Sequence, residues 1–278
     1  MKKIPYGKLD VKLVALDLDD TLLNDEREIC ENTIVALQKC AAAGIYVVLC
    51  SGRAEDGILP FVRKLNIAGL EAGKFLIAIN GCSIFDLHSR TQIYKKIVPT
   101  DVLRFCDDEA EKLGLNTEIY SGDTIFYAKE TYWTRLDVDL CHLNGVVLND
   151  YKNFLSKGSP KMLIPGEPEK LVVLQEKLKN SLGDKAVIFT SKPFFLEILP
   201  PNCGKGEAIS WLAKHIGLDI QNCLAFGDSM NDESMIRLCG YGVSMINGLD
   251  YIKEIADFVT ELDNNHGGVG DFLDKFVL

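Results

Sequence analysis

Residues 11–22 read VKLVALDLDDTL, an apolar run that ends in three carboxylates, Asp17, Asp19 and Asp20. The leucine-rich and β-branched part of the run, residues 11–18, predicts a strand that is buried on both faces. Like charges repel, and burying each one costs several kcal/mol unless a partner compensates it. The end of this strand is therefore the first candidate for a functional site.

The composition is that of an ordinary globular protein. The 278 residues are 47% hydrophobic and 25% charged, which is enough to bury a large core, and the length predicts about two domains. The formal net charge is −10 and the isoelectric point is near 5.0. We therefore expect no nucleic-acid or membrane partner, because both carry negative charge. An anionic substrate needs a local positive field, from a metal or a few lysines.

The cysteines and the N-terminal residues indicate a cytoplasmic protein. Nine cysteines are scattered without a C-x-x-C pair, which favours buried thiols in a reducing compartment over a zinc site. Pro5, Gly7 and Asp10 interrupt the start of the chain, so no signal peptide is expected. No run approaches the roughly 18 apolar residues of a membrane helix. The sequence carries no pattern that fixes an oligomeric state.

Both ends of the chain alternate strands and helices. Early on, the strand at 11–18 is followed by helical spacing over 31–43 and by a strand over 45–50, an order that implies a parallel pair with a right-handed crossover. The late block repeats this order, with a helix over 205–216, a strand over 222–226, a helix from about 231 and a strand near 241–245.

The middle of the chain has a different pattern. A helix at 101–113 and another at 167–182 are each followed by two strands with a turn between them. Such hairpins predict an antiparallel sheet with helices on one face. We predict an α/β fold, in which a doubly wound parallel-sheet (Rossmann-like) core of residues 1–85 and 199–278 carries an α+β domain inserted at 86–198. The alternative is two domains in series, and insertion is preferred because the chemistry of the two ends is complementary.

Acidic side chains follow two of the predicted parallel strands. Ligands of such a sheet bind beyond the carboxyl ends of its strands. Asp17 and Asp19 alternate along an extended chain, so both carboxylates are expected to face one point, where Asp228 adds a third. Oxygen ligands suit a hard cation such as Mg²⁺. A single Asp at a strand end is more often a turn former or helix cap, but the convergence of three favours a metal site.

Other residues at these strand ends are suited to a phosphate. Ser51 and Gly52 offer a hydroxyl and closely approaching backbone N–H groups. Lys205 stands at a predicted helix start, where a cation is mildly disfavoured unless an anion lies near it. Asn231 and Asp232 open another helix, so helix capping is an equally good interpretation of that pair.

Together these strings resemble the motifs of the haloacid dehalogenase superfamily of phosphohydrolases. Residues 17–21 look like its D-x-D-x-T motif, Ser51 its second motif, Lys205 its third, and residues 227–232 its G-D-x-x-N-D motif. The insertion between the second and third motifs, preceded by Ile79-Asn80-Gly81, resembles the class IIB cap of the Cof-type branch.

The chain departs from the family pattern in two places. Asp20 stands where the family often has Gly. Near the C-terminus, Asn247-Gly248 and Gly267-Gly268-Val269 stand where the family often has Asn-Ala and Asp-Gly-Val. Neither departure falls at Asp17, the first aspartate of the D-x-D-x-T motif.

The resemblance implies a Mg²⁺-dependent phosphatase of small phosphorylated metabolites, such as sugar phosphates, flavin mononucleotide or pyridoxal phosphate. Asp17 would be the nucleophile that forms an aspartyl-phosphate, and Asp19 would protonate the leaving group and then activate water. The metal ligands would be Asp17, the backbone carbonyl of Asp19, and Asp228, with Asp232 in support.

Elementary electrostatics supports this assignment, because a carboxylate that attacks a phosphate dianion needs Mg²⁺ and Lys205 to offset the repulsion. Ser51, with the adjoining Gly52, and Asn231 would hold the remaining phosphoryl oxygens.

Two other functions fit the same residues. A phosphomutase shares the aspartyl-phosphate and differs in the acceptor, and a non-catalytic module would bind Mg²⁺ and a phosphoryl group without turnover. Asp19 and the cap insertion argue against the second. Specificity is expected from the cap, where the polar and aromatic candidates are Tyr120, Tyr127, Lys161 and Glu197.

Overall fold

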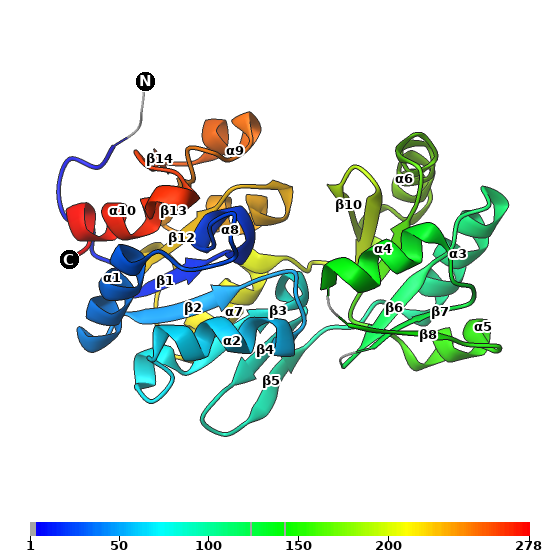
Figure 1. The fold of residues 1–278 in the computed structure, drawn as a ribbon, viewed down its shortest axis with the longest axis horizontal. Coiled ribbons are helices and arrows are strands. Elements are labelled where there is room, and N and C mark those ends of the chain that lie inside the picture. Colours follow the sequence, from blue (N-terminus) through cyan, green and yellow to red (C-terminus); the bar gives the residue numbers. More distant parts are fainter. Residues whose placement is uncertain (1–3, 123, 142) are drawn as a thin grey trace. The chain divides into compact units, whose positions relative to one another are not determined.

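The computed structural model describes residues 4–122, 124–141 and 143–278, and the chain divides into two compact units (Figure 1). The core unit comprises Met1–Tyr94 and Gly204–Leu278, and the inserted unit comprises Lys95–Cys203. The sequence placed the insertion at 86–198. In the structure the inserted unit spans Lys95–Cys203 instead. It starts later because the strands Ser83–Asp86 and Thr91–Lys95 belong to the sheet of the core unit.

The core unit is built on one sheet, which has eight strands among the described residues. In order across the sheet they are β14 (Phe258–Val259), β13 (Tyr241–Ser244), β12 (Cys223–Gly227), β1 (Leu13–Leu16), β2 (Tyr46–Cys50), β3 (Phe75–Ala78), β4 (Ser83–Asp86) and β5 (Thr91–Lys95). The strands from β14 to β3 are parallel, and β4 is antiparallel to β3.

Strand β1 is the point at which the strand order reverses. The chain passes from β1 to β2 on one side, and β12 pairs with β1 on the other. Leu16 is in register with Phe226 of β12 and with Leu49 of β2. The residues that follow these three strands therefore emerge together at one edge of the sheet, which is where open α/β sheets bind their ligands.

Helices cover both faces of the core sheet. They are α1 (Glu31–Ala42), α2 (Glu55–Leu65), α7 (Lys205–His215), α8 (Glu233–Leu238), α9 (Asp250–Ile255) and α10 (Gly268–Phe276). Ala15 and Ala225 pack with Leu212 of α7 on one face. Phe226 contacts Phe272 of α10 on the other, with ring centroids 5.4 Å apart. The parallel pairing from β14 to β3 and the helices on both faces confirm the predicted α/β class with a parallel-sheet core.

The inserted unit has a six-stranded sheet among the described residues. Its order is β10 (Val187–Lys192), β11 (Phe195–Leu199), β9 (Met162–Pro165), β6 (Glu118–Ser121), β7 (Thr124–Tyr127) and β8 (Asn144–Val147). Its helices are α3 (Thr100–Lys112), α4 (Tyr132–Cys141), α5 (Tyr151–Phe154) and α6 (Pro168–Leu182). The predicted Ser121-Gly122-Asp123 turn lies partly outside the described residues, which exclude residue 123.

The faces of this second sheet differ in their cover. Ile119, Ile164 and Leu196 pack with α3 and α6 on one face, as the repeated helix and hairpin pattern predicts. Val138 of α4 packs with Leu163 on the other. None of the helices in the described part of the chain is long and apolar enough to span a bilayer.

Candidate active site

Asp17 follows β1 directly, and its side chain is almost completely buried. Its backbone N–H donates to the carbonyl oxygen of Phe226 at 3.1 Å, which continues the pairing with β12 by one residue. The chain then turns, because Leu18–Leu22 form a helical turn in which Asp20 has φ 60°. The strand therefore ends earlier than the predicted residue 18. Strand alternation does not set the direction of the side chains after Asp17.

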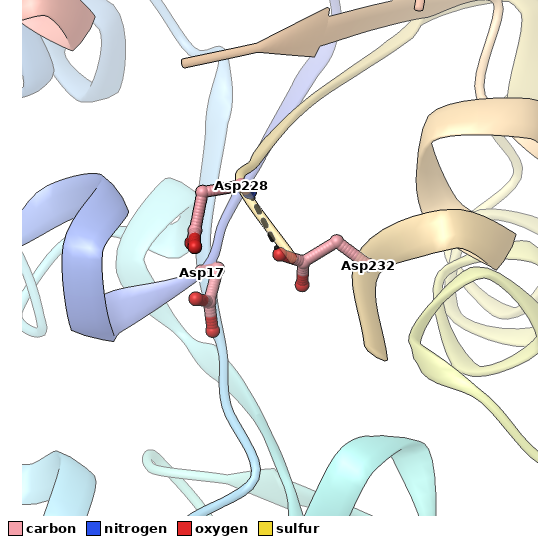
Figure 2. A group of neighbouring side chains, drawn as sticks. All are labelled: Asp17, Asp228 and Asp232. Atoms are coloured by element: carbon pink, nitrogen blue, oxygen red, sulfur yellow. Dashed lines mark hydrogen bonds between the residues drawn. The ribbon is translucent and has the colours of Figure 1, made fainter. Parts of the chain in front are cut away.

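Three carboxylates converge at this point. Oxygen atoms of Asp17, Asp228 and Asp232 all lie within 4.8 Å of one another (Figure 2). Asp17 comes from the end of β1, Asp228 follows β12, and Asp232 directly precedes α8. The sequence predicted that Asp17, Asp19 and Asp228 converge, with Asp232 in support, and this cluster contains Asp17, Asp228 and Asp232.

The loop after β12 is held by Asp232, which is completely buried. Its Oδ2 accepts the backbone N–H groups of Asp228 at 2.9 Å and Ser229 at 3.1 Å, and Figure 2 shows the first of these bonds. A Cβ atom on Gly227 would lie 2.5 Å from the Cβ of Asp232, so only glycine fits there. Thr21 donates its hydroxyl to Oδ1 of Asp228 at 2.8 Å. These contacts fix the direction of the Asp228 carboxylate.

Lys205 supplies a positive charge to this cluster. It is the first residue of α7, its side chain is completely buried, and its Nζ lies 2.5 Å from Oδ1 of Asp17 and 2.5 Å from Oδ1 of Asp232. Burial alone would lower the pKa of Lys205, but the charges of Asp17 and Asp232 outweigh burial and raise it. The lysine is therefore an ammonium ion. Its position at a helix start suggested that an anion lies near it, and two carboxylates do.

If all three carboxylates were ionised, they would carry more negative charge than one ammonium offsets. Burial, and next the charge of Asp232, raises the pKa of Asp17 to about 7. Burial, and then the charges of Asp232 and Asp17, raises the pKa of Asp228 to about 9. A nearby divalent cation would favour the ionised forms, and three buried oxygen donors are what a hard cation requires. The residues present therefore fit a divalent metal ion.

The carboxylate of Asp19 pairs with Arg53. Arg53 Nε donates to its Oδ2 at 3.0 Å and Arg53 Nη2 to its Oδ1, and the Asp19 side chain is 54% exposed. The side chain of Asp19 is not part of the cluster of Asp17, Asp228 and Asp232, although its charge contributes to raising the pKa of Asp17. That the carboxylates of Asp17 and Asp19 face one point stays a prediction. A metal contact through the backbone carbonyl of Asp19 stays a prediction.

The predicted phosphate-binding residues lie on loops that meet beside Asn80. Ser51 is buried, and its Oγ accepts the backbone N–H of Arg53 at 3.2 Å. A Cβ on Gly52 would lie 3.0 Å from Oδ1 of Asn80, so the carboxamide packs directly on the glycine. Asn231 donates from Nδ2 to the same oxygen at 3.2 Å.

The family model of haloacid dehalogenase-like hydrolases matches residues 14–273. The chain belongs to this family. The family membership that the four motifs indicated is therefore confirmed. The prediction that the chain is an enzyme of the phosphatase type is confirmed with it.

Two relatives and one solved structure cover almost the whole chain. A 5-amino-6-(5-phospho-D-ribitylamino)uracil phosphatase of Bacillus subtilis is 29% identical over 97% of this chain and 97% of its own. An HMP-PP phosphatase of Serratia proteamaculans is 28% identical over 88% of this chain and 87% of its own. The crystal structure of a haloacid dehalogenase-like hydrolase from Bacteroides thetaiotaomicron is 31% identical, with a TM-score of 0.83 over 95% of this chain and 98% of that one.

Three residues of this haloacid dehalogenase-like site were not assigned roles from the sequence. Thr21 binds Asp228, Arg53 binds Asp19, and Asn80 binds Asn231. Thr21 and Asn80 lie inside strings that the sequence analysis quotes, at residues 17–21 and 79–81, and Arg53 directly follows Ser51 and Gly52. Their position in or beside those strings was a usable signal, but which partner each contacts depends on the tertiary structure.

The four specificity candidates of the inserted unit are buried inside it. Tyr120, Tyr127, Lys161 and Glu197 are each less than a tenth exposed. Lys161 Nζ lies 3.5 Å from Oε2 of Glu197 and 4.4 Å from the ring centroid of Tyr120, which donates its hydroxyl to Asp137. Lys161, Glu197 and Tyr120 thus form part of a polar network within the unit, while Tyr127 donates its hydroxyl to Glu130. A substrate contact for any of the four stays a prediction.

Proposed function

We propose that this haloacid dehalogenase-like hydrolase is a Mg²⁺-dependent phosphatase that hydrolyses small phosphorylated metabolites through an aspartyl-phosphate on Asp17. The observation that carries the proposal is the cluster of Asp17, Asp228 and Asp232 around the ammonium of Lys205. A buried carboxylate beside a buried ammonium is suited to attack an anionic phosphorus centre, since the cation offsets the repulsion between them.

Asp17 and Asp19 divide the chemistry between them. In the first step an oxygen of Asp17 bonds to phosphorus, the bond from phosphorus to the ester oxygen breaks, and Asp19 gives that oxygen a proton. In the second step Asp19 takes a proton from water, the water oxygen bonds to phosphorus, and the bond to Asp17 breaks. The products are the dephosphorylated alcohol and inorganic phosphate. Asp19 is suited to this role because its side chain is exposed while Asp17 is buried.

The remaining residues hold the phosphoryl group and the metal. Mg²⁺ would be held by Asp17, the backbone carbonyl of Asp19 and Asp228. Asp232 would support these ligands, because it accepts the backbone N–H groups of Asp228 and Ser229. When bound, the ion would neutralise phosphoryl charge. Lys205 donates from Nζ to Oδ1 of Asp17 and so holds that carboxylate in place, and it would also bind a phosphoryl oxygen.

Ser51, Gly52 and Asn231 are assigned to the other phosphoryl oxygens. They stand on loops that meet beside Asn80. Ser51 offers a hydroxyl, Asn231 a carboxamide N–H, and Gly52 a backbone N–H.

The substrate class follows from the relatives. One is named for a phosphorylated ribitylamino-uracil and another for HMP-PP. We infer that this chain also acts on a small phosphorylated metabolite, with phosphorylated sugars and cofactors as the compounds to test first.

A panel of such phosphoesters, assayed for inorganic phosphate with Mg²⁺ present, tests the proposal. We expect release from at least one small ester, loss of release on addition of a chelator, and no release by D17N. Conversion of a hexose phosphate into its isomer without free phosphate would instead identify a phosphomutase. Failure to release phosphate from every ester would favour the non-catalytic binding module.

A further inference from the structure

Residues 79–81 form an unusual turn at the end of β3. Ile79, Asn80 and Gly81 have φ values of 53°, 51° and 90°, so three consecutive residues lie in the left-handed region. Glycine adopts this region freely and asparagine tolerates it, but a β-branched residue there is a genuine outlier. A strained conformation persists only where its surroundings enforce it, and such outliers cluster at functional sites.

Backbone bonds attach this turn to the loop after β2. Ser51 N–H donates to the carbonyl of Ile77 at 3.0 Å, Ile79 N–H to that of Arg53 at 2.9 Å, and Asn80 N–H to that of Ser51 at 2.9 Å. The loop that carries Ser51 and Gly52 therefore continues the pairing of β2 with β3 past the end of β2, through residues 77–80.

The turn also contacts the start of α7. A Cβ on Gly81 would lie 2.1 Å from the carbonyl oxygen of Gly204, the residue before Lys205. The turn thus touches the Ser51 loop and the Lys205 helix, and through the Asn80 side chain it also reaches Asn231. These are the three places that carry the predicted phosphate-binding residues.

The side chain of Asn80 occupies the centre of this arrangement. It is 2% exposed, and its Oδ1 accepts from Nδ2 of Asn231 at 3.2 Å while lying against Gly52. The Asn231 carboxamide nitrogen has two hydrogens, and donating one of them to Asn80 directs the other. The same contact fixes the distance between Asn231 and the Gly52 backbone.

We propose that Asn80 is a positioning residue of the phosphate site: its carboxamide, presented by the left-handed 79–81 turn, sets the orientation of Asn231 and its distance from the Ser51-Gly52 loop. This inference rests on the proposed function, because it assumes that Asn231 and the Ser51 loop bind the phosphoryl group. Asn80 itself needs no contact with substrate.

The test combines N80G, N231A and the double variant N80G/N231A. Glycine keeps the left-handed backbone accessible, so N80G removes the carboxamide without adding backbone strain. The matched control is N66G, because Asn66 has φ 53° and ψ 38°, is exposed and ends α2. Each variant is measured for KM and kcat on an active ester and for the inhibition constant of inorganic phosphate.

We expect N80G to raise KM and the phosphate inhibition constant by about tenfold, with a smaller change in kcat. The N66G control should match wild type. In the N231A background, N80G should have little further effect, because Asn80 acts through Asn231. Wild-type values for N80G, or effects of N80G and N231A that multiply in the double variant, would overturn the proposal.

Two further measurements keep the outcome interpretable. Thermal unfolding shows whether N80G is folded, and N80A compared with N66A replaces the glycine pair if it is not. If wild type hydrolyses no ester, the proposed phosphatase function fails, but calorimetric titration with inorganic phosphate and Mg²⁺ still tests Asn80. In that titration, equal phosphate affinity in wild type and N80G would contradict the positioning role.

Discussion

Lys205 Nζ lies 2.5 Å from Oδ1 of Asp17 and equally close to Oδ1 of Asp232, so one buried ammonium joins two carboxylates from opposite ends of the chain. The first pair is separated by 188 residues of sequence and the second by 27. This ion network connects the end of β1 with the start of both α7 and α8. Its charges are therefore coupled to the stability of the core unit as well as to catalysis.

Removing the ammonium should destabilise the protein. In K205M the carboxylates of Asp17 and Asp232 lose their buried partner, and we expect the free energy of unfolding to fall by about 3–5 kcal/mol. Urea unfolding measures this loss. The double variant K205M/D232N should recover part of it, because one buried charge is then removed. Wild-type stability in K205M would show that the network carries no net interaction.

A divalent cation should stabilise the folded protein. Because burial and neighbouring charges raise the pKa of Asp17 to about 7 and of Asp228 to about 9, the cluster gains from added positive charge. Saturation at a hundred times the dissociation constant of Mg²⁺ should add about 2.7 kcal/mol, seen as a higher melting temperature that a chelator reverses.

The matched variants for the metal are D228N and D250N. D228N removes a proposed ligand and should lose most of the Mg²⁺-dependent rise in melting temperature. D250N removes an exposed carboxylate of α9 and should keep that rise in full. An equal rise in both variants would place the ion away from Asp228.

Asp19 and Asp20 should respond differently to the same substitution. D19N removes the proposed proton donor and should lower kcat by at least about a hundredfold. D20N is the control, since asparagine tolerates the φ of 60° at that turn and the backbone carbonyl of Asp20 still accepts from Asn247. Steady-state kinetics measures kcat for both variants, and equal losses of kcat would count against the proton-transfer role of Asp19.

Glu118 should make stability depend on pH. It is fully buried, and burial followed by the charge of Asp137 raises its pKa well above 4.5, with the charge of Lys161 opposing. The folded protein then keeps a proton that the unfolded chain has released. The stability from this group is complete below about pH 4.5 and is lost as pH rises toward the raised pKa.

The variant E118Q removes this titration. We expect its melting temperature to fall less than that of wild type between about pH 5 and about pH 8. Glu111 on α3 is an exposed partner of Lys152, so E111Q is the control and should keep the wild-type slope. A wild-type slope in E118Q would mean that Glu118 is ionised in the folded state.

The candidate site was largely predictable because parallel strands end at one sheet edge. Reading only the residues after the strands identified Asp17, Ser51, Asp228 and the neighbouring Asn231, and their loops meet where β1 pairs with its neighbours. The pairing of Asp19 with Arg53 was not predictable in this way. Residues 16–19 alternate between leucine and aspartate as an extended strand would, so periodicity gave no sign that β1 ends at Leu16.

The inserted unit was predicted only in outline. The two helix and hairpin segments were identified, but α4, β8, α5 and β9 between them were not. Strand β8 is exposed along its length and β9 is buried along its length, so neither alternates between apolar and polar residues. Their pairing with β7, β6 and β11 is determined by tertiary contacts that local pattern does not encode.

The most direct test of the central claim is to identify the phosphorylated residue during turnover. Wild-type enzyme, Mg²⁺ and an active ester are mixed, quenched rapidly in acid and analysed by peptide mass spectrometry. We predict one phosphoryl group on Asp17, with none on that peptide in D17N and no turnover by that variant. Turnover by D17N, or phosphate release with no phosphoryl group ever found on Asp17, would contradict the mechanism.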